Sequence, residues 1–372
     1  MPLQPKPFHL RVPDAALTDL HERLRRVRWP DEPPLEPWST GTSLEYLKQL
    51  VQYWQMQYDW RAQEEGIINR FRQFTVPIAG IELHFIHQPG RCARPIPLLL
   101  SHGWPGSIVE FYKLIPLLTE RFSVVAPSLP GYALSFKPGQ RRFGAGEIAD
   151  VFAELMTDVL GYERFAAQGG DWGAFISSVL GWKYPERLLG IHLNLLAVRR
   201  DPKERADSPE EEKYLRELAH WLKEDMGYQW IQGTRPQTLA YGLADSPVGL
   251  AAWIAEKFRA WSDCDGDIER AITRDELLTN ISLYWFTGAI GSSFWPYYAR
   301  MHGGWPIPEG KTVDVPTGYA AFPREILRPP RSLAARTYTN IRRWSVMEKG
   351  GHFAALEQPR ALTAEITEFF TE

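Results

Sequence analysis

The spacing of apolar residues changes several times along the chain, and each change predicts a new kind of element. Over residues 17–27 leucine and valine recur at helical spacing. This predicts an amphipathic helix with Asp14 as its N-cap and with its end at Trp29-Pro30. A second helix is expected over residues 43–58. Neither helix can bury its apolar face alone, so we expect both to pack on the rest of the protein.

From about residue 74 the apolar residues alternate with polar ones or form short continuous runs, which predicts strands. Residues 74–78 and 81–88 flank Ala79-Gly80 and predict a hairpin. Further strands are expected at residues 97–101, 123–126, 165–167 and 188–195, separated by helices at residues 108–118, 145–160 and 172–184. Strands that alternate with helices indicate an α/β fold, with a mostly parallel sheet and helices on both faces.

The alternation stops between residues 198 and 300, where the sequence is helix-like and rich in aromatic residues. We interpret this segment as a helical cap inserted over the C-terminal edge of the sheet. Strands at residues 311–316 and 343–348 and a helix at residues 361–370 are expected to complete the core. The expected domains are therefore an N-terminal arm (1–75), a core (76–197 and 301–372) and a cap (198–300).

Composition and charge exclude several classes of function. The 372 residues carry a formal net charge of −3, so neither nucleic acid nor an anionic membrane is expected as a partner. Cys92 and Cys264 match no metal or redox spacing and are interpreted as free thiols of a reducing compartment. The N-terminus lacks the apolar core of a signal peptide, and no apolar run approaches the roughly 20 residues of a membrane span. We expect a cytoplasmic protein without a membrane anchor, and the sequence leaves a homodimer open.

The stretch Gly169-Gly170-Asp171-Trp172-Gly173 carries the strongest chemical signal. It lies between an expected strand and an expected helix, and small residues two positions before and after Asp171 allow a sharp turn. Such a turn holds its central side chain at the top of a sheet, beside the positive end of a helix. Serine is the usual occupant, whereas a carboxylate at this position would be a nucleophile that forms an ester intermediate.

Two further groups would complete a catalytic triad with Asp171. His352, in Gly350-Gly351-His352-Phe353, lies after a late strand and before the last helix, where the base of such a triad is expected. The acid that orients it should lie between the two in sequence, and Asp314 and Glu325 are both candidates. Glu325 is favoured because it follows an expected strand in a loop, whereas Asp314 is expected inside that strand.

The stretch His102-Gly103-Trp104-Pro105 also follows an expected strand and precedes an expected helix. Its glycine allows the backbone to approach closely. The amides of Trp104 and Trp172 would together form an oxyanion hole. His102 itself is interpreted as a structural residue.

These motifs resemble those of epoxide hydrolases of the microsomal type. The resemblance spans nearly the whole chain, since it also includes Arg28-Trp29-Pro30, Tyr228, residues 245–250, residues 292–298, Pro316-Thr317-Gly318 and Phe322-Pro323. It implies an α/β-hydrolase fold with a helical cap and an N-terminal meander packed around both. Microsomal relatives from animals have an N-terminal membrane anchor, and because this chain starts at the arm, we do not expect that location here.

The resemblance also implies a reaction and the residues that perform it. An epoxide and water would give a vicinal diol through an aspartyl ester. Asp171 matches the nucleophile, His352 the base that activates water, and Glu325 the acid that orients this base. No metal and no organic cofactor are implied.

Two tyrosines of the cap are implied as donors to the oxygen of the opening ring. Tyr228 matches one of them, and Tyr297 is favoured over the adjacent Tyr298 for the other. An apolar or aryl-substituted epoxide is the expected small-molecule partner, because aromatic residues near these tyrosines would line its site: Trp230, Phe294 and Trp295.

Two alternatives differ from this interpretation in their chemistry. A haloalkane dehalogenase would use the same Asp, His and carboxylate under a cap, but it releases halide with indole or amide donors rather than paired phenols. A non-enzymatic binding protein on the same scaffold would not need Asp171, His352 and Glu325 together.

The stretch Asp263-Cys264-Asp265-Gly266-Asp267 begins like a calcium-binding loop. Such a loop is closed by a glutamate at its twelfth position, and Arg274 occupies that position here. We therefore expect a solvated loop of the cap.

Overall fold

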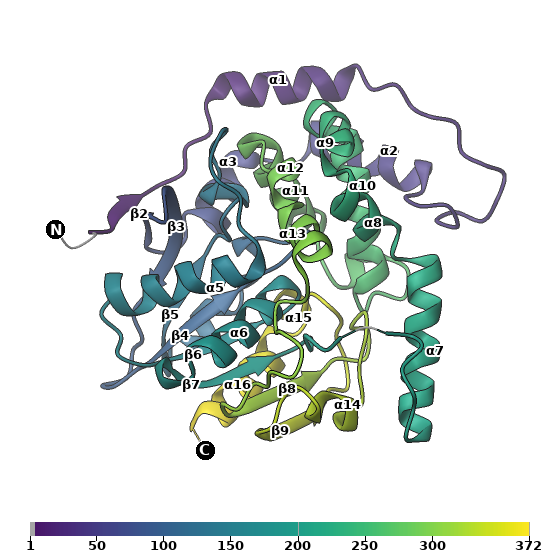
Figure 1. Ribbon diagram of the computed structural model, residues 1–372. Helices are drawn as coiled ribbons and strands as arrows, with labels where there is room; N and C mark the ends of the chain where they lie inside the picture. The colour runs from purple at the N-terminus through teal and green to yellow at the C-terminus, as the bar shows by residue number, and fades with distance from the viewer. Residues whose placement is uncertain (1–3, 200, 372) are drawn as a thin grey trace.

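The computed structural model describes residues 4–199 and 201–371. In this part of the chain a nine-stranded sheet forms the centre of the molecule (Figure 1). Its order is β1-β2-β3-β5-β4-β6-β7-β8-β9, with antiparallel pairing from β1 to β5 and parallel pairing from β5 to β9. The strands are β1 (Lys6–Phe8), β2 (Gln73–Ile78), β3 (Ile81–Gln88), β4 (Ile96–Ser101), β5 (Phe122–Pro127), β6 (Phe165–Gly169), β7 (Leu188–Leu193), β8 (Thr317–Ala321) and β9 (Ile341–Val346).

Helices cover both faces of this sheet. The helix α6 (Trp172–Lys183) packs on β4, β6 and β7 and against α5 (Ala145–Glu154), which a π-helical turn at Leu155–Val159 continues. The helix α16 (Pro359–Thr371) packs on β7, β8 and β9 and against α4 (Ile115–Leu118). Ile191 of β7 lies toward Gly181 of α6, while its neighbour His192 lies against Phe369 of α16. Successive strand residues point to opposite faces, so α6 and α16 lie on opposite sides.

The middle of the parallel part brings two loops together at one edge. β4 and β6 are neighbours, and their last residues, Ser101 and Gly169, are paired. The chain leaves both strands at this edge and enters α6 directly after β6. A Cβ atom on Gly173 would lie 1.9 Å from the carbonyl oxygen of Ser101, so only glycine lets α6 approach β4 this closely.

The cap lies above this edge of the sheet in Figure 1, and the arm runs over the cap. The cap consists of α7 (Pro209–Glu224), α8 (Gly227–Thr234), α9 (Pro236–Asp245), α10 (Pro247–Trp261), α11 (Arg274–Thr287), α12 (Ile290–Ser293) and α13 (Trp295–Gly303). The arm contains α1 (Asp14–Arg25), α2 (Leu44–Met56) and α3 (Trp60–Gln63), and two short helices, α14 (Arg331–Ala335) and α15 (Ala354–Glu357), belong to the core.

Polar contacts hold the arm in place. The carboxylate of Glu64 is fully buried and accepts hydrogen bonds from the Val12 amide (2.6 Å) and the Trp60 indole (3.1 Å). On the cap side, the Tyr53 hydroxyl donates to Asp275 (2.9 Å) and Arg23 pairs with Asp245 (2.9 Å). The arm thus joins the edge of the sheet, through β1, to the outer side of the cap, as its two amphipathic helices predict.

The structure confirms the predicted α/β fold and the hairpin at Ala79-Gly80. Three local predictions are wrong. Asp14 is the first residue of α1, whose N-cap is Pro13, and α1 ends at Arg25. The helix expected over residues 108–118 is a 3₁₀ turn (Ile108–Phe111) followed by the separate helix α4 (Ile115–Leu118). Pro116 lies in the first turn of α4, where its missing N–H is tolerated, but it would interrupt a continuous helix.

The third correction concerns the strand expected at residues 311–316. Here only Val313 makes an isolated bridge, to Tyr338, and the strand β8 follows Pro316 instead. The sequence Thr-Gly-Tyr-Ala-Ala of β8 has few of the bulky residues that mark strands, because the ring of Phe369 fills the space beside Gly318. The proposed domain boundaries also fall inside elements: residue 75 lies within β2 and residue 300 within α13.

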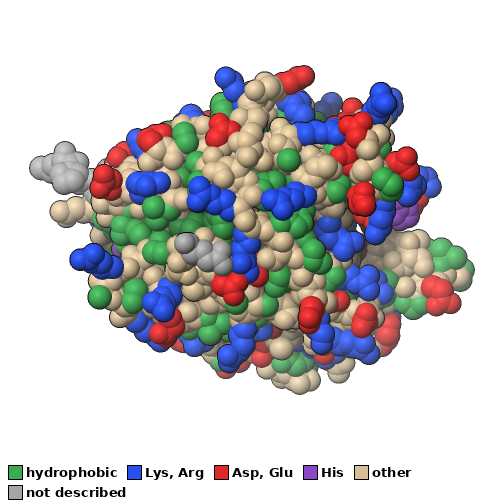
Figure 2. Space-filling view, turned by 90° about the horizontal axis from the view of Figure 1, so that it is seen from below, with side chains coloured by type: hydrophobic (Ala, Val, Ile, Leu, Met, Phe, Trp, Pro, Cys, Tyr) green, Lys and Arg blue, Asp and Glu red, His purple; other side chains and the backbone are tan. Residues whose placement is uncertain are grey.

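The surface seen in Figure 2 carries interspersed basic and acidic side chains. This agrees with the small net charge of the chain. Among the described residues, no helix combines the length and the apolar character that crossing a bilayer requires.

The close packing of α6 on β4 leads to a stability prediction. Gly173→Ala should lower the free energy of unfolding by about 3 kcal/mol, because the added methyl group overlaps the Ser101 carbonyl. Gly146→Ala in α5 is the matched control, since nothing lies within 4 Å of its added Cβ, and we expect a gain of up to about 1 kcal/mol. Urea unfolding of both variants measures these changes, and equal stability of Gly173→Ala and the parent would contradict the close approach.

Candidate active site

Asp171 occupies the tight turn between β6 and α6. Its backbone has φ 48° and ψ −128°, a strained conformation for a residue with a side chain. A Cβ atom on Gly169 would lie 2.2 Å from the carbonyl oxygen of Gly173, so the turn closes only because both flanking residues are glycine. The sequence therefore places the carboxylate at the C-terminal edge of the sheet, as the motif predicts.

The loop after β4 supplies a donor to this carboxylate. The Trp104 amide donates to Asp171 Oδ1 at 2.8 Å, and a Cβ atom on Gly103 would lie 2.2 Å from the same oxygen. Trp172 is the first residue of α6, where the backbone N–H has no acceptor within the helix. The two amides predicted to form an oxyanion hole thus both border Asp171.

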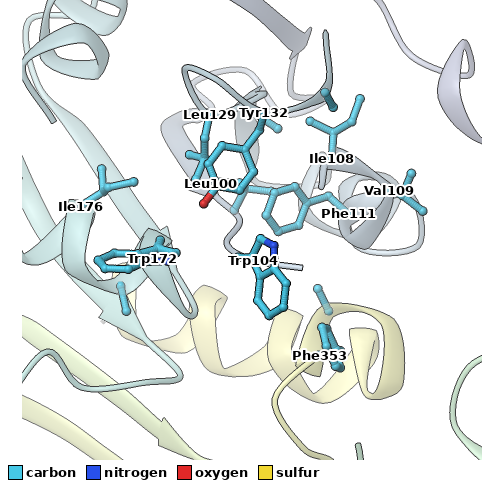
Figure 3. Packing of buried hydrophobic residues seen from close by; sticks show 14 of the residues in the cluster. Leu100, Trp104, Ile108, Val109, Phe111, Leu129, Tyr132, Trp172, Ile176 and Phe353 are labelled. Atoms are coloured by element: carbon cyan, nitrogen blue, oxygen red, sulfur yellow. The ribbon is translucent and has the colours of Figure 1, made fainter. Parts of the chain in front are cut away.

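His102 has a structural role in this loop, as predicted. Burial lowers the pKa of His102 to about 4, so the ring is neutral at pH 7. Its Nε2 atom accepts a hydrogen bond from the Leu129 amide at 3.2 Å. Figure 3 shows the loop residue Trp104 surrounded by buried side chains that include Leu100, Phe111 and Tyr132.

His352 lies between two carboxylates. Its Nδ1 atom is 2.6 Å from Glu325 Oε1, and its Nε2 atom is 3.5 Å from Asp171 Oδ2. The side chains of His352 and Glu325 are 2% and 0% exposed. Burial alone would lower the pKa of His352, but the charges of Glu325 and Asp171 outweigh it and raise this pKa well above its usual value.

The other candidate acid, Asp314, does not reach His352. It is exposed and accepts a hydrogen bond from the Thr339 hydroxyl at 2.6 Å. Glu325, by contrast, lies in the loop after β8, where an isolated bridge between Arg324 and Gly351 joins this loop to the one that carries the histidine. The geometry therefore supports the choice of Glu325.

Two cap tyrosines lie over the turn that carries Asp171. Tyr228 and Tyr297 are buried, and their ring centroids are 5.8 Å apart. Both rings pack on Trp104, at 5.4 and 5.9 Å, and Tyr297 also packs edge-on against Trp172 at 4.8 Å. The Tyr228 hydroxyl accepts a hydrogen bond from the Gln229 amide at 2.8 Å, whereas that of Tyr297 has no hydrogen-bond partner among the described residues.

The structure distinguishes Tyr297 from its neighbour. Tyr298 stacks on His302 and Trp295 and lines a separate cavity, which the core residues Phe136 and Arg142 also border. Burial, and then the charge of Asp171, raise the pKa of Tyr297 well above its usual value, so its hydroxyl stays protonated and available as a donor.

Of the three predicted substrate contacts, only Phe294 comes to this site. It is fully buried with its ring centroid 6.3 Å from that of Trp104. The other two lie elsewhere: Trp230 is 53% exposed on α8, and Trp295 lines the same separate cavity as Tyr298. In a helix this short, the spacing of apolar residues along the sequence does not show which of its aromatic side chains face inward.

The end of α10 and the loop that follows it, where residues 263–267 begin like a calcium-binding loop, hold the loop that carries His352. The Trp261 carbonyl accepts a hydrogen bond from the His352 amide (2.8 Å), and the Asp263 carboxylate accepts one from the Gly350 amide (2.9 Å). Glu357 completes this clamp, since its carboxylate accepts from the amides of Asp263 (2.8 Å) and Phe353 (3.0 Å). The described residues contain no cluster of three or more His, Cys, Asp or Glu side chains that could hold a metal ion.

Sequence reasoning missed one carboxyl group. Glu110, on the 3₁₀ turn after the Trp104 loop, lines a small cavity together with Asp171 and His352. The sequence did contain a signal for this residue, because Glu110 is a charged residue within a largely apolar helix expected over residues 108–118.

Known proteins resemble this chain over nearly its whole length. Residues 5–111 match the family described as "Epoxide hydrolase N terminus", and residues 96–255 match "alpha/beta hydrolase fold". A putative epoxide hydrolase of Stigmatella aurantiaca is 44% identical, covering 98% of this chain and 84% of that protein. Epoxide hydrolase 1 of Oryctolagus cuniculus is 37% identical, covering 98% of this chain and 88% of that protein.

Solved structures of epoxide hydrolases also resemble this chain. The juvenile hormone epoxide hydrolase of the silkworm Bombyx mori superposes with a TM-score of 0.89 at 31% identity, covering 99% of this chain and 94% of that one. The Aspergillus niger epoxide hydrolase gives a TM-score of 0.86 at 32% identity, covering 99% and 96%. These similarities show that the chain belongs to the epoxide hydrolase family of enzymes with the α/β-hydrolase fold.

Proposed function

We propose that this enzyme converts an epoxide and water to a vicinal diol through an ester at Asp171. The observation that carries the proposal is the position of the Asp171 carboxylate, between the Trp104 amide on one side and His352 on the other, beneath Tyr228 and Tyr297. Every group that the two chemical steps require lies around this carboxylate.

In the first step Asp171 attacks a carbon of the ring, and the carbon–oxygen bond that breaks leaves an alkoxide. The hydroxyls of Tyr228 and Tyr297 donate to this oxygen as its charge develops, and one of them transfers its proton. The pKa of Tyr297 is raised by burial, and a buried phenol is a donor that does not ionise before substrate arrives.

In the second step water attacks the ester carbonyl carbon, and His352 accepts a proton from it. Forming the ester removes the negative charge of Asp171, which is one of the two charges that hold the pKa of His352 high. This pKa therefore falls when the ester forms, and the imidazole becomes available as a base at that stage of the cycle. The Trp104 and Trp172 amides stabilise the oxyanion that develops on Asp171.

The substrate is proposed to be an epoxide with an apolar or aryl substituent. The walls near the proposed reacting groups are aromatic, and Trp104 and Phe294 are both fully buried. Such walls favour apolar groups by burial and aryl groups by ring packing.

A haloalkane dehalogenase is the second candidate, and one observation favours it. The indole N–H groups of Trp104 and Trp172 are buried without a hydrogen-bond partner among the described residues, and indoles can bind a departing halide. The paired phenols and the relatives favour the epoxide. Assays with 1-bromobutane and styrene oxide in parallel distinguish the two, since only a dehalogenase releases bromide.

The ester can be trapped by removing its base. In His352→Ala we expect styrene oxide to alkylate Asp171 while turnover falls about 100- to 10,000-fold, because general-base catalysis contributes that much. Intact mass spectrometry should show one added styrene oxide per chain. Asp171→Ala is the control and should gain no mass; an unlabelled His352→Ala protein would contradict the ester mechanism.

The proposed role of Tyr228 and Tyr297 in ring opening can be tested with Tyr298 as the control. Tyr228→Phe with Tyr297→Phe should abolish measurable ring opening, because each lost donor to a developing oxyanion costs about 100-fold or more. Tyr298→Phe removes a phenol outside the site and should leave turnover of styrene oxide unchanged. A double variant that works at the parental rate would refute the role of the pair.

The triad acid can be tested through pH. Because His352 has a raised pKa in the folded protein, its pairing with Glu325 stabilises the fold fully below the unfolded value of about 6.5 and loses this effect as pH rises through the raised pKa. Glu325→Gln should therefore cost about 3–5 kcal/mol at pH 6, where it removes the nearer of the two carboxylates that pair with the buried imidazolium, and less at high pH.

Asp314→Asn is the matched control for this test, since Asp314 is the exposed carboxylate that sequence reasoning also considered. It should change neither the stability at pH 6 nor the pKa of His352, which an NMR titration of the imidazole measures. Equal effects of the two substitutions would argue against Glu325 as the acid.

A further inference from the structure

The second chemical step needs a water molecule beside both Asp171 and His352, and the structure contains a space of the right size. A cavity of about 20 Å³ lies behind the Asp171 turn. One ordered water needs roughly 10–15 Å³ of such volume, so this cavity has room for a single molecule. Its polar border includes Asp171, His352, Glu110, Gln168 and Asn194.

Glu110 is the group on this border that the mechanism does not yet use. It lies on the 3₁₀ turn Ile108–Phe111, which follows the loop carrying Trp104. Glu110 is partly buried, and its carboxyl group interacts with the Ser107 backbone amide. Among the described residues no lysine or arginine forms an ion pair with it. A Cβ atom on Gly106 would lie 1.6 Å from Glu110 Oε1, so glycine at 106 is what lets this carboxyl group occupy its position.

The other polar residues of the cavity are less suited to hold a reacting water. The Gln168 amide donates to Asn194 at 2.8 Å, so these two side chains already engage each other. His102 accepts its hydrogen bond from the Leu129 amide. Two groups remain: the Ser101 hydroxyl, which is buried without a hydrogen-bond partner among the described residues, and Glu110. Glu110 is the stronger acceptor of the two, because its group is a carboxyl.

We propose that Glu110 holds the hydrolytic water in this cavity by accepting one of its two hydrogens. The proposal rests on the proposed function, because it assigns a residue to the second step of that reaction. In this step the water oxygen bonds to Cγ of Asp171, and the bond from Cγ to the diol oxygen breaks. The proton that His352 removes passes to the departing oxygen. The second hydrogen stays on the new carboxyl group until Asp171 ionises and returns it to the phenol that protonated the alkoxide.

The electrostatics agree with this arrangement. Burial raises the pKa of Glu110 to about 8, with His352 lowering it and Asp171 raising it. The two groups proposed to act on the water line the same cavity as Glu110. A carboxyl group in this position can orient the water while His352 takes the proton.

The test separates the two half-reactions by rapid mixing of excess enzyme with styrene oxide. Glu110→Met keeps the length of the side chain but removes the acceptor. We expect ester formation within about threefold of the parental rate and ester hydrolysis slowed about 10- to 100-fold, the effect of one lost hydrogen bond to a reacting group. The ester should then accumulate at steady state. Glu110→Gln retains an acceptor oxygen and should restore most of the hydrolysis rate.

Glu357→Gln is the matched control. Glu357 is also a partly buried carboxyl group beside the His352 loop, but it does not border the cavity. Glutamine keeps an acceptor oxygen for the amides that Glu357 binds, so we expect ester hydrolysis within about threefold of the parental rate and no accumulation of ester. If Glu357→Gln accumulated ester as Glu110→Met does, the effect would come from disturbing His352, and the water site would be refuted. Should Glu110→Met fail to fold, Glu110→Ala removes the acceptor without adding bulk and carries the same expectation.

Failure of this proposal differs from failure of the proposed function. If the parent turns over styrene oxide and His352→Ala traps the ester, but Glu110→Met hydrolyses the ester at the parental rate, only the role of Glu110 is wrong. If the parent neither opens the epoxide nor forms an ester in the His352→Ala background, the proposed function itself is wrong.

Discussion

The close contact between α6 and β4 is the constraint on which the site depends. The Gly173 backbone lies against the Ser101 carbonyl, and this approach forces Asp171 into its strained turn. The same contact sets how near the Trp104 loop comes to the carboxylate, because that loop starts where β4 ends. Backbone packing therefore positions Asp171 and the Trp104 amide, the proposed nucleophile and oxyanion donor.

The other proposed site residues come from distant parts of the chain. His352 and Glu325 follow β9 and β8, and their loops meet because these strands continue the parallel sheet beside β7. The phenols come from α8 and α13, which pack on each other above the same edge. The core thus supplies Asp171 and His352, proposed to attack the ring and to activate water, and the cap supplies the phenols proposed to open the ring.

Sequence alone could predict the residues whose roles follow from local pattern and chain order. Asp171 sits in a glycine-framed turn, and His352 and Glu325 follow late strands, so these three could be chosen without a structure. Other features depend on packing between distant segments. β8 was missed because its small residues fit under the Phe369 ring, and the inward or outward direction of Trp230 is set by how α8 rests on α13.

The clamp between Trp261, Asp263 and the His352 loop has a consequence for how the enzyme moves. Lifting the cap at this side would break the hydrogen bond that holds the His352 backbone and withdraw the Trp261 indole, 5.0 Å from the imidazole. Movement of the cap at this side would therefore displace His352, the proposed base. The clamp thus makes the position of this side chain depend on how the cap is seated on the core.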